Sequence, residues 1–301
     1  MTIDDAYLAY PNRRYGTDQD RYGWALAKDR PPLAWPDGKA LACMIVVPIE
    51  HHMLNPSGKP FKHPGAMMTP YPDLRHYTSR DYGNRVGVFR LLKALDAAGL
   101  KAVLPVNALQ LDRLRPVIDA ALDAGHEIAA YGLSTDHLHW GGLDRAVEDG
   151  WVAQVRALFD AAGLSPRTWM SPARQQSFAT LDLIAKHGFD ICLDWESDEV
   201  PIVMTTDHGP IHAIPLSNEL DDRTLLIDRR QTEERWADQI IEAKDFLVAD
   251  AIAGRLLGFT LTPYVAGQPF RQHALRRMLA AIAGDARVWS ATATQVVEAR
   301  G

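Results

Sequence analysis

The sequence predicts an α/β protein whose main part is a single barrel, closed or nearly closed, of about seven or eight β-α units. Three observations favour this fold. Residues 40–47 form a continuous apolar run of strand length, strand-like and helix-like segments alternate after it, and 301 residues are enough for one barrel of about 250 residues with an extension. The alternative is an open doubly wound sheet. However, the sequence has no G-x-G-x-x-G after the first strand and no G-x-x-x-x-G-K-[ST] anywhere, so a nucleotide site is not supported.

The chain divides into an irregular N-terminal arm, residues 1–38, and a barrel domain, residues 39–301. The arm is rich in Pro, Asp, Arg and Tyr and has no apolar period. We therefore expect it to lie over the domain or to form a subunit contact. The apolar run that follows it suits a strand that is buried on both faces.

Apolar runs predict the other strands, and apolar residues at three-and-four spacing predict the helices between them. The expected strands are residues 101–107, 126–131, 167–171, 190–195, 211–217, 258–263 and a short one near 287–290. The expected helices are residues 86–98, 111–124, 143–162, 180–187, 232–253 and 271–283. The Pro-rich segment 53–85 has no clear period, and because so long a loop is usually functional we expect a lid or a pocket wall.

The composition argues for a small-molecule substrate. A net charge of −6 and the lack of a Lys/Arg cluster argue against nucleic acid and against an anionic membrane surface as partners. The first residues carry no positive leader, and the longest apolar run is far shorter than the ~20 residues that span a bilayer, so we expect a cytoplasmic protein. Cys43 and Cys192 lie in apolar, strand-like segments, where we expect buried, reduced thiols.

Polar residues follow nearly every predicted strand, at the end where a parallel barrel carries its active site. They are Glu50, His51 and His52 after the first strand, then Asn107, Tyr131, Arg174, Asp194 with Trp195, Glu219 and Thr262. Because apolar residues precede almost all of them, the pattern changes there from core to rim. We therefore treat this set as the candidate site.

Glu50 is the main catalytic candidate, because partial burial of a carboxylate at a barrel mouth can raise its pKa until it serves as a general base or acid. The alternative is a solvated glutamate, or one paired with Arg85 or Arg174. His52 could orient the carboxylate, titrate or bind a metal, but a histidine pair of this kind is often only structural. Asp194 offers the second carboxylate of an acid/base pair, or else caps a helix over a core tryptophan.

Arg174 could bind a carboxylate or an imide oxygen, although it could equally be an ordinary surface arginine. Trp195 offers an aromatic wall beside Asp194. No G-x-S-x-G elbow is present, so a Ser-His-Asp hydrolase is not indicated.

These residues and four motifs resemble the polysaccharide deacetylase superfamily, and within it the allantoinase-like and cyclic-imide-hydrolase-like branch. The first motif, residues 81–90, is similar to that branch's Y-G-x-R-V-G-x-x-R segment. The others are residues 124–128 (AGHEI), 192–195 (CLDW) and 261–271 (LTPYVAGQPFR). Their order and spacing make the resemblance specific, and it covers residues 40–290.

The resemblance implies a distorted (β/α)₇ barrel that hydrolyses an amide-type bond and tends to form homo-oligomers. Metal-dependent members have an Asp-Asp pair after the first strand, an H-x-x-x-H pair after the third strand and a later histidine. At those positions this sequence has Glu50-His51, Tyr131 with Thr135, and Thr262. Because two of the three usual protein ligands of a catalytic zinc are missing, we expect no metal cofactor.

A displaced metal site is the alternative, with His51, His137 and His139 as its ligands. It would favour a metal-dependent deacetylase of an N-acetylated sugar. A barrel that binds a ligand without turnover is a third possibility.

The first hypothesis is a metal-independent hydrolase of a non-peptide C–N bond in a small cyclic amide, imide or ureide. Glu50 would activate water, and Asp194 or His52 would protonate the leaving nitrogen. The substrate would be positioned by Asn107, Tyr131, Arg174, Trp195 and Glu219.

Overall fold

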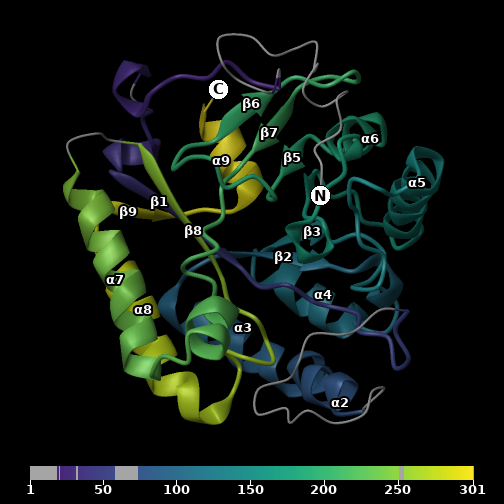
Figure 1. The fold of residues 1–301 in the computed structure, drawn as a ribbon. Coiled ribbons are helices and arrows are strands. Elements are labelled where there is room, and N and C mark those ends of the chain that lie inside the picture. The colour runs from purple at the N-terminus through teal and green to yellow at the C-terminus, as the bar shows by residue number, and fades with distance from the viewer. Residues whose placement is uncertain (1–18, 20, 32, 58–73, 251–253, 301) are drawn as a thin grey trace.

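One sheet of nine strands organises the computed structural model, which describes residues 19, 21–31, 33–57, 74–250 and 254–300 (Figure 1). The strands are β1 (Leu41–Val46), β2 (Ala102–Val106), β3 (Glu127–Ala130), β4 (Thr168–Trp169), β5 (Ile191–Cys192), β6 (Ile202–Met204), β7 (Ile211–Ala213), β8 (Arg255–Thr260) and β9 (Val288–Ser290). Their order is β6-β7-β5-β4-β3-β2-β1-β8, and β9 pairs with β1 beside this path. All pairs are parallel except β6 with β7. The sequence prediction of an α/β fold with a distorted barrel is confirmed.

Strand β1 lies at the centre of the fold because its sequence is apolar on both faces. All six of its residues are buried. It pairs with β8 along its whole length on one edge, and on the other edge with β9 first and then with β2. The chain continues extended to a bridge between Ile49 and Val106, so that Glu50 emerges at the carboxyl end of the sheet.

Helices surround the sheet, and α7 packs alongside α8 (Figure 1). They are α2 (Arg75–Tyr82), α3 (Val88–Ala98), α4 (Arg115–Asp123), α5 (Arg145–Ala161), α6 (Thr180–Lys186), α7 (Glu233–Ala249), α8 (Gln272–Ala283) and α9 (Ala293–Arg300). Six of these correspond to the helices expected from apolar spacing. Gly99 ends α3 at a φ of 67°, the left-handed conformation that a C-cap glycine supplies without strain.

Part of the expected loop at 53–85 is helical instead. Helix α2 is followed by a π-helical turn, Gly83–Gly87, which leads directly into α3. The sequence of α2 is mostly polar, so it has no apolar stripe that periodicity could detect. Residues 58–73 of the expected lid lie outside the described residues. Strand β6 and helix α9 were also not expected from the sequence.

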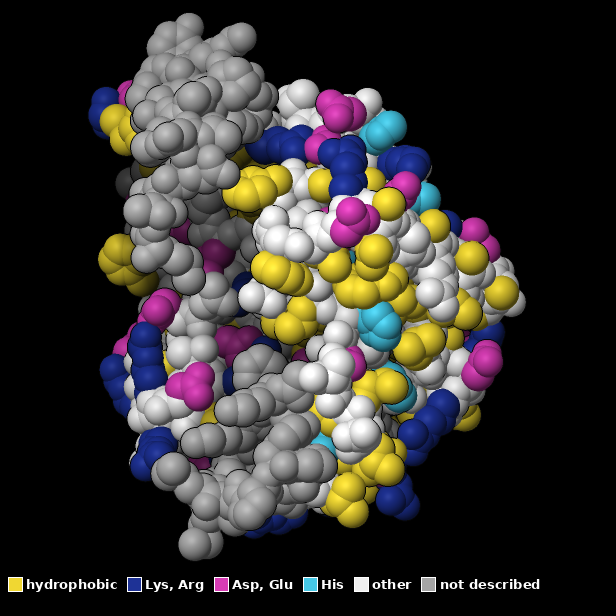
Figure 2. Space-filling model, turned by 45° about the vertical axis from the view of Figure 1, so that its right-hand side comes forward, with side chains coloured by type: hydrophobic (Ala, Val, Ile, Leu, Met, Phe, Trp, Pro, Cys, Tyr) yellow, Lys and Arg dark blue, Asp and Glu magenta, His cyan; other side chains and the backbone are white. Residues whose placement is uncertain are grey.

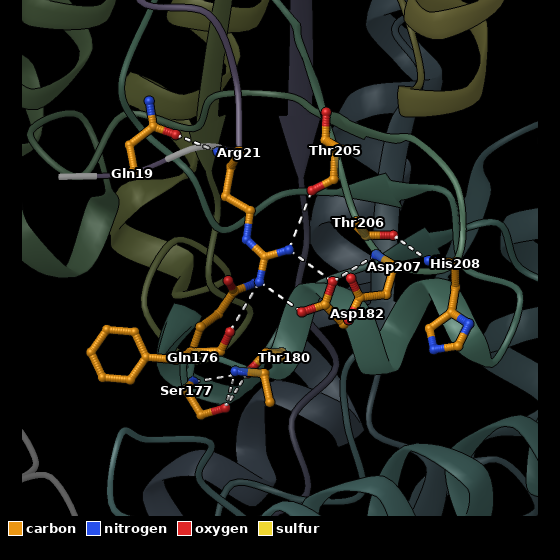
Figure 3. A network of polar contacts seen from close by, with 12 residues as sticks. Gln19, Arg21, Gln176, Ser177, Thr180, Asp182, Thr205, Thr206, Asp207 and His208 are labelled. Atoms are coloured by element: carbon orange, nitrogen blue, oxygen red, sulfur yellow. Dashed lines mark hydrogen bonds and ion pairs between the residues drawn. The ribbon is translucent and has the colours of Figure 1, made fainter. Parts of the chain in front are cut away.

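The described part of the N-terminal arm packs on the barrel domain (Figure 3). Arg21 donates from Nη1 and Nη2 to the two carboxylate oxygens of Asp182 in α6, each at 2.7 Å, and from Nη1 to the carbonyl oxygen of Thr205. Farther along the arm, the buried Trp35 donates from Nε1 to the carbonyl oxygen of Arg255 in β8 at 2.8 Å. The arm thus bridges α6, the segment after β6, and β8.

Cys43 and Cys192 are free thiols and both are buried, as expected. No helix within the described ranges is long and apolar enough to cross a membrane. On the face shown in Figure 2, apolar side chains gather on the right-hand half among several histidines, and basic side chains lie above them.

Candidate active site

Glu50 is buried at the carboxyl end of β1, with 6% of its surface exposed. The side chain of Asn84 donates to its carbonyl oxygen at 2.8 Å and fixes the backbone there. Its carboxylate lies 3.2 Å from His52 Nε2, 3.4 Å from the Tyr131 hydroxyl and 3.5 Å from Arg223 Nη1. The structure therefore brings together the predicted residues Glu50, His52 and Tyr131, and it adds Arg223.

The pKa of Glu50 moves in the direction opposite to the one expected from the sequence. Burial raises it, but the hydrogen bond from His52 and the positive charges of Arg223, His52 and Arg80 outweigh burial, and the pKa falls to about 2. The partner in the ion pair is Arg223, and not Arg85 or Arg174 as considered above. Glu50 is thus ionised throughout the neutral range when no substrate is bound.

The side chain of His52 contacts one neighbour through each ring nitrogen. Nε2 faces the Glu50 carboxylate, and Nδ1 lies 3.4 Å from Thr135 Oγ1. Thr135 donates its single hydroxyl proton to the carbonyl oxygen of His51 at 2.9 Å, so toward His52 it can only accept. His52 is thus held between Glu50 and Thr135, with Nε2 directed at the carboxylate.

Tyr131 ends β3 and directs its hydroxyl toward Glu50. Burial and the negative charge of Glu50 raise the pKa of Tyr131, so the phenol keeps its proton and can donate it. The backbone amide of Ala173 also hydrogen-bonds to this side chain. The hydroxyl thus connects the ends of β1, β3 and β4.

Asn107 holds neighbouring strand ends together through both ends of its side-chain amide. Its oxygen accepts from the backbone amide of His51 at 2.6 Å, and its nitrogen donates to the carbonyl oxygen of Tyr131. The residue is fully buried. Its contacts position the segments that carry the site.

Asp194 and Trp195 form a second polar group, at the ends of β4 and β5. Asp194 accepts from the backbone amide of Ser171 at 2.9 Å and from Gln176 Nε2 at 2.6 Å, and Trp195 donates to Gln176 Oε1 at 2.9 Å. Burial raises the pKa of Asp194 despite the hydrogen bonds from Ser171. The positive charge of Arg174 acts in the opposite direction and lowers the pKa of Asp194. No contact between this group and Glu50 is present among the described residues.

Glu219 lies apart from both groups. It is exposed and forms an ion pair with Arg229. The structure therefore does not bring this predicted substrate-binding residue to the site.

The three histidines of the conditional metal site do not form one group. His51 Nδ1 meets Gln110 Nε2 at 2.6 Å, His137 Nδ1 meets Ser134 Oγ at 2.7 Å, and the buried His139 meets Glu148 at 2.8 Å. Within the described ranges, no three His, Cys, Asp or Glu residues are placed to hold a metal ion. The described residues therefore give no support to the alternative of a displaced metal site, because each imidazole is held by a different neighbour.

The zinc implied by the family resemblance also does not fit these residues. At the positions of the missing histidines, the Tyr131 hydroxyl faces Glu50 and the Thr135 hydroxyl is bound to the backbone of His51. Thr262 is bound through its backbone amide and its hydroxyl to Asp222, at 2.7 and 2.8 Å. The side chains that replace the ligands thus form hydrogen bonds within the protein.

A cavity of about 280 Å³ lies beside the Glu50 group. Arg223 and Tyr264 belong to its wall and also lie near Glu50. Arg223 forms the ion pair with Glu50, and the Tyr264 ring meets the His52 ring edge to face, with 6.2 Å between the ring centres. The guanidinium of Arg80 lies 5.6 Å from the centre of the Tyr264 ring. The full lining is Arg80, Ala173, Arg174, Asn218, Asp221, Arg223, Thr224, Ile227, Asp228 and Tyr264.

Sequence reasoning missed Arg80 and Arg223. Neither follows a predicted strand: Arg80 lies in α2, and Arg223 begins a π-helical segment, Arg223–Asp228. The only sequence signal for Arg223 is the acidic pair before it, Asp221-Asp222, which is unusual next to the apolar residues that follow.

Comparisons with known proteins agree with this fold. No protein-family model matches the chain. The PuuE allantoinase superposes with a TM-score of 0.79 at 23% identity, over 93% of this chain and 96% of that one. A probable polysaccharide deacetylase of Pseudomonas aeruginosa PAO1 superposes with a TM-score of 0.77 at 21% identity, over 95% of this chain and 96% of that one. The chain thus has the distorted half-barrel fold of the polysaccharide deacetylases, with a mixed sheet.

Among sequence relatives, a peptidoglycan deacetylase of Helicobacter pylori is 28% identical over 108 residues. That match spans 36% of this chain and 36% of that protein.

Proposed function

We propose that this protein is a hydrolase of a non-peptide C–N bond, and that its substrate is a small cyclic amide, imide or ureide. The observation that carries the proposal is the buried Glu50 carboxylate, contacted by His52 and Tyr131 at the carboxyl end of the central strand. The adjacent cavity of about 280 Å³ supports a small ring as the ligand, because it lies near the lower limit of about 300 Å³ for small-molecule pockets. The similarity of the fold to an allantoinase and to a probable polysaccharide deacetylase is consistent with hydrolysis of a C–N bond.

In the proposed reaction, water adds to the carbonyl carbon and the C–N bond breaks. Glu50 accepts a proton from the water, and His52 passes a proton to the leaving nitrogen. The Tyr131 hydroxyl and the Arg223 guanidinium stabilise the negative charge that develops on the carbonyl oxygen. The product is a carboxylate on one side and, on the other, an amine from a cyclic amide, a carboxamide from an imide or a ureido group from a ureide.

The low pKa of Glu50 sets a condition on this mechanism. A carboxylate with a pKa of about 2 is a weak base, and this weakness comes from the hydrogen bond with His52 and then from the charges of Arg223, His52 and Arg80. A substrate oxygen that accepts a hydrogen bond from Arg223 would weaken the effect of the Arg223 charge on the pKa of Glu50. Base strength then increases when the substrate binds.

Deacetylation of an N-acetylated sugar is the second candidate, favoured by the partial sequence match to a peptidoglycan deacetylase. It requires the same attack of water on an amide carbonyl. It differs in requiring room for a sugar, and the described cavity is small for an oligosaccharide.

The first prediction tests both candidates together. Purified protein is assayed against allantoin, hydantoin, dihydrouracil, succinimide and glutarimide, and against N-acetylglucosamine oligomers and N-acetylated peptidoglycan fragments. We expect turnover of at least one cyclic compound and none of the sugars. Glu50→Gln is expected to lower kcat by about 10²- to 10⁴-fold, the usual contribution of a general base.

The matched control is Glu242→Gln, which changes an exposed glutamate paired with Arg235 on α7. It should keep wild-type kcat. Unchanged kcat in Glu50→Gln would refute the role of Glu50, turnover of sugars alone would favour the second candidate, and no turnover of either class would indicate a barrel that only binds a ligand.

A further inference from the structure

Arg174 is placed in the cavity by an unusual turn at the end of β4. Ala173 and Arg174 both have positive φ values, 57° and 53°, a conformation that non-glycine residues rarely adopt in succession. The backbone amide of Arg174 donates to the carbonyl oxygen of Ser171 at 2.8 Å and closes the turn. Strain of this kind at the rim of a site is typical of residues with a functional position.

The guanidinium of Arg174 is held by a neutral partner. Its Nη1 donates to the carbonyl oxygen of Leu216 at 2.8 Å, which leaves its other donors for further partners. Among the described residues no carboxylate forms an ion pair with it, and Asp194 acts on it only from a distance. The side chain is half-buried, so its positive charge is concentrated on the cavity that it lines.

Three arginines line the cavity, but Arg223 is already paired with Glu50, so the positive charge offered to a ligand is that of Arg174. Arg80, Arg174 and Arg223 all line it, and Arg80 is 3% exposed. Two carboxylates belong to the lining: Asp221, which lies 3.8 Å from Arg223, and Asp228, which is exposed at the edge. Arg174 is half-buried, which limits screening of its charge by water and favours an anion beside it.

We infer that the substrate carries a carboxylate next to its scissile ring, and that Arg174 binds this carboxylate. This inference rests on the proposed function and adds the substrate class: an acidic cyclic amide, imide or ureide. The arrangement divides the cavity into two ends. Arg223 contacts Glu50 and lies where the scissile carbonyl is attacked, whereas Arg174 comes from the turn after β4 and receives the substituent.

The planar guanidinium suits this role because its paired N–H donors match the two oxygens of a carboxylate. The volume of about 280 Å³ is sufficient for a ring and one short acidic group. Specificity for charge would therefore come from one residue that takes no part in the proton transfers.

The test compares acidic and neutral members of matched pairs: dihydroorotate with dihydrouracil, and hydantoin-5-acetate with hydantoin. We expect kcat/KM to favour the acidic member by about 10- to 100-fold, the range of one charge-assisted hydrogen-bonded contact. Arg174→Gln should remove most of that preference, mainly by raising KM for the acidic member, so that the two members of a pair have similar kcat/KM. Arg174→Lys should restore part of it.

The control is Arg235→Gln, which changes an exposed arginine on α7 and should leave the preference intact. A merely structural role of Arg174 predicts equal losses for both members of a pair in both variants. That outcome, or equal kcat/KM for acidic and neutral rings in the wild type, would overturn the inference.

A binding measurement separates this inference from the proposed function. Calorimetry with dihydroorotate and with its carboxamide is carried out on the wild type and on Arg174→Gln. Tighter binding of the acid that depends on Arg174, without turnover of any ring, would refute the hydrolase and retain the carboxylate site. Equal binding of the acid and the carboxamide would refute the carboxylate site whatever the turnover.

Discussion

The protonation state of Glu50 is decided by a competition between burial and charge. Burial alone would raise its pKa, which is what the position of the residue after an apolar strand suggests. Three cationic side chains, His52, Arg223 and Arg80, reverse that effect. The sequence places His52 beside Glu50, but nothing in it indicates that two arginines from distant segments converge on the same carboxylate.

Substitution of Arg223 tests this competition directly. Arg223→Gln removes a positive charge that favours the ionised carboxylate, so the pKa of Glu50 is expected to rise above about 2, toward its ordinary value. The pKa can be followed by carbon NMR of labelled glutamate, which does not depend on activity. Arg235→Gln, far from the site, should leave the titration unchanged. An unaltered Glu50 titration in Arg223→Gln would contradict the assignment.

The same shift predicts how stability depends on pH. The folded-state pKa of Glu50 is depressed from 4.5 to about 2, so its contribution is fully present above about 4.5 and is lost as the pH falls toward 2. In Glu50→Gln the free energy of unfolding should therefore decline less between these two pH values than in the wild type. Urea unfolding at a series of pH values measures the difference, and identical slopes would contradict it.

Three glycines set the distance between the π-helical turn before α3 and the segment after β8 that carries Tyr264. A Cβ on Gly87 would lie 2.0 Å from the carbonyl oxygen of Pro263, and one on Gly267 would lie 2.5 Å from the Cα of Gly87. A Cβ on Gly83 would lie 2.7 Å from the backbone nitrogen of Tyr264. Backbone packs against backbone here, and only glycine permits this close approach.

Gly87→Ala should therefore destabilise the protein by about 1–3 kcal/mol, because the added Cβ clashes with the backbone of Pro263, which must move. It should also lower kcat, since Tyr264 would be displaced from His52. Gly150→Ala in the middle of α5 is the control: its Cβ meets nothing within 4 Å, and alanine is the better helix former by about 1 kcal/mol. Denaturant unfolding distinguishes the two. Equal stability of both variants would contradict the close packing.

Periodicity could predict the strands and helices that carry a strong apolar pattern, such as β1, β8, α3 and α8. It could not predict α2, whose residues are mostly polar, or β6, a three-residue antiparallel strand with one exposed side chain. The consequence for the site is direct. Glu50 and Tyr131 follow parallel strands, so the sequence could predict that they lie at the same edge, whereas Arg80 could not be placed before its helix α2 was known.

The arm and the barrel domain are connected by a partly buried ion pair between Arg21 and Asp182, which makes their association measurable. Arg21→Ala removes both hydrogen bonds to Asp182, a residue with 5% of its surface exposed, and should lower the free energy of unfolding by about 2 kcal/mol. Arg115→Ala breaks an exposed pair with Asp119 and should change it by less than about 0.5 kcal/mol. Equal effects in thermal unfolding would show that the arm contributes no more than an ordinary surface contact.

The two ends of the sheet already carry backbone hydrogen bonds to non-strand segments. Next to β8, Ser217 donates to the carbonyl oxygen of Gly258 and Leu256 donates to that of Glu199, at 2.9 and 2.8 Å. Beyond β6, Thr205 donates to the carbonyl oxygen of Arg21 at 2.7 Å. A second molecule that approached β8 to add a strand would find the Gly258 carbonyl and the Leu256 amide already in use, so the two crossing segments oppose edge-to-edge pairing there.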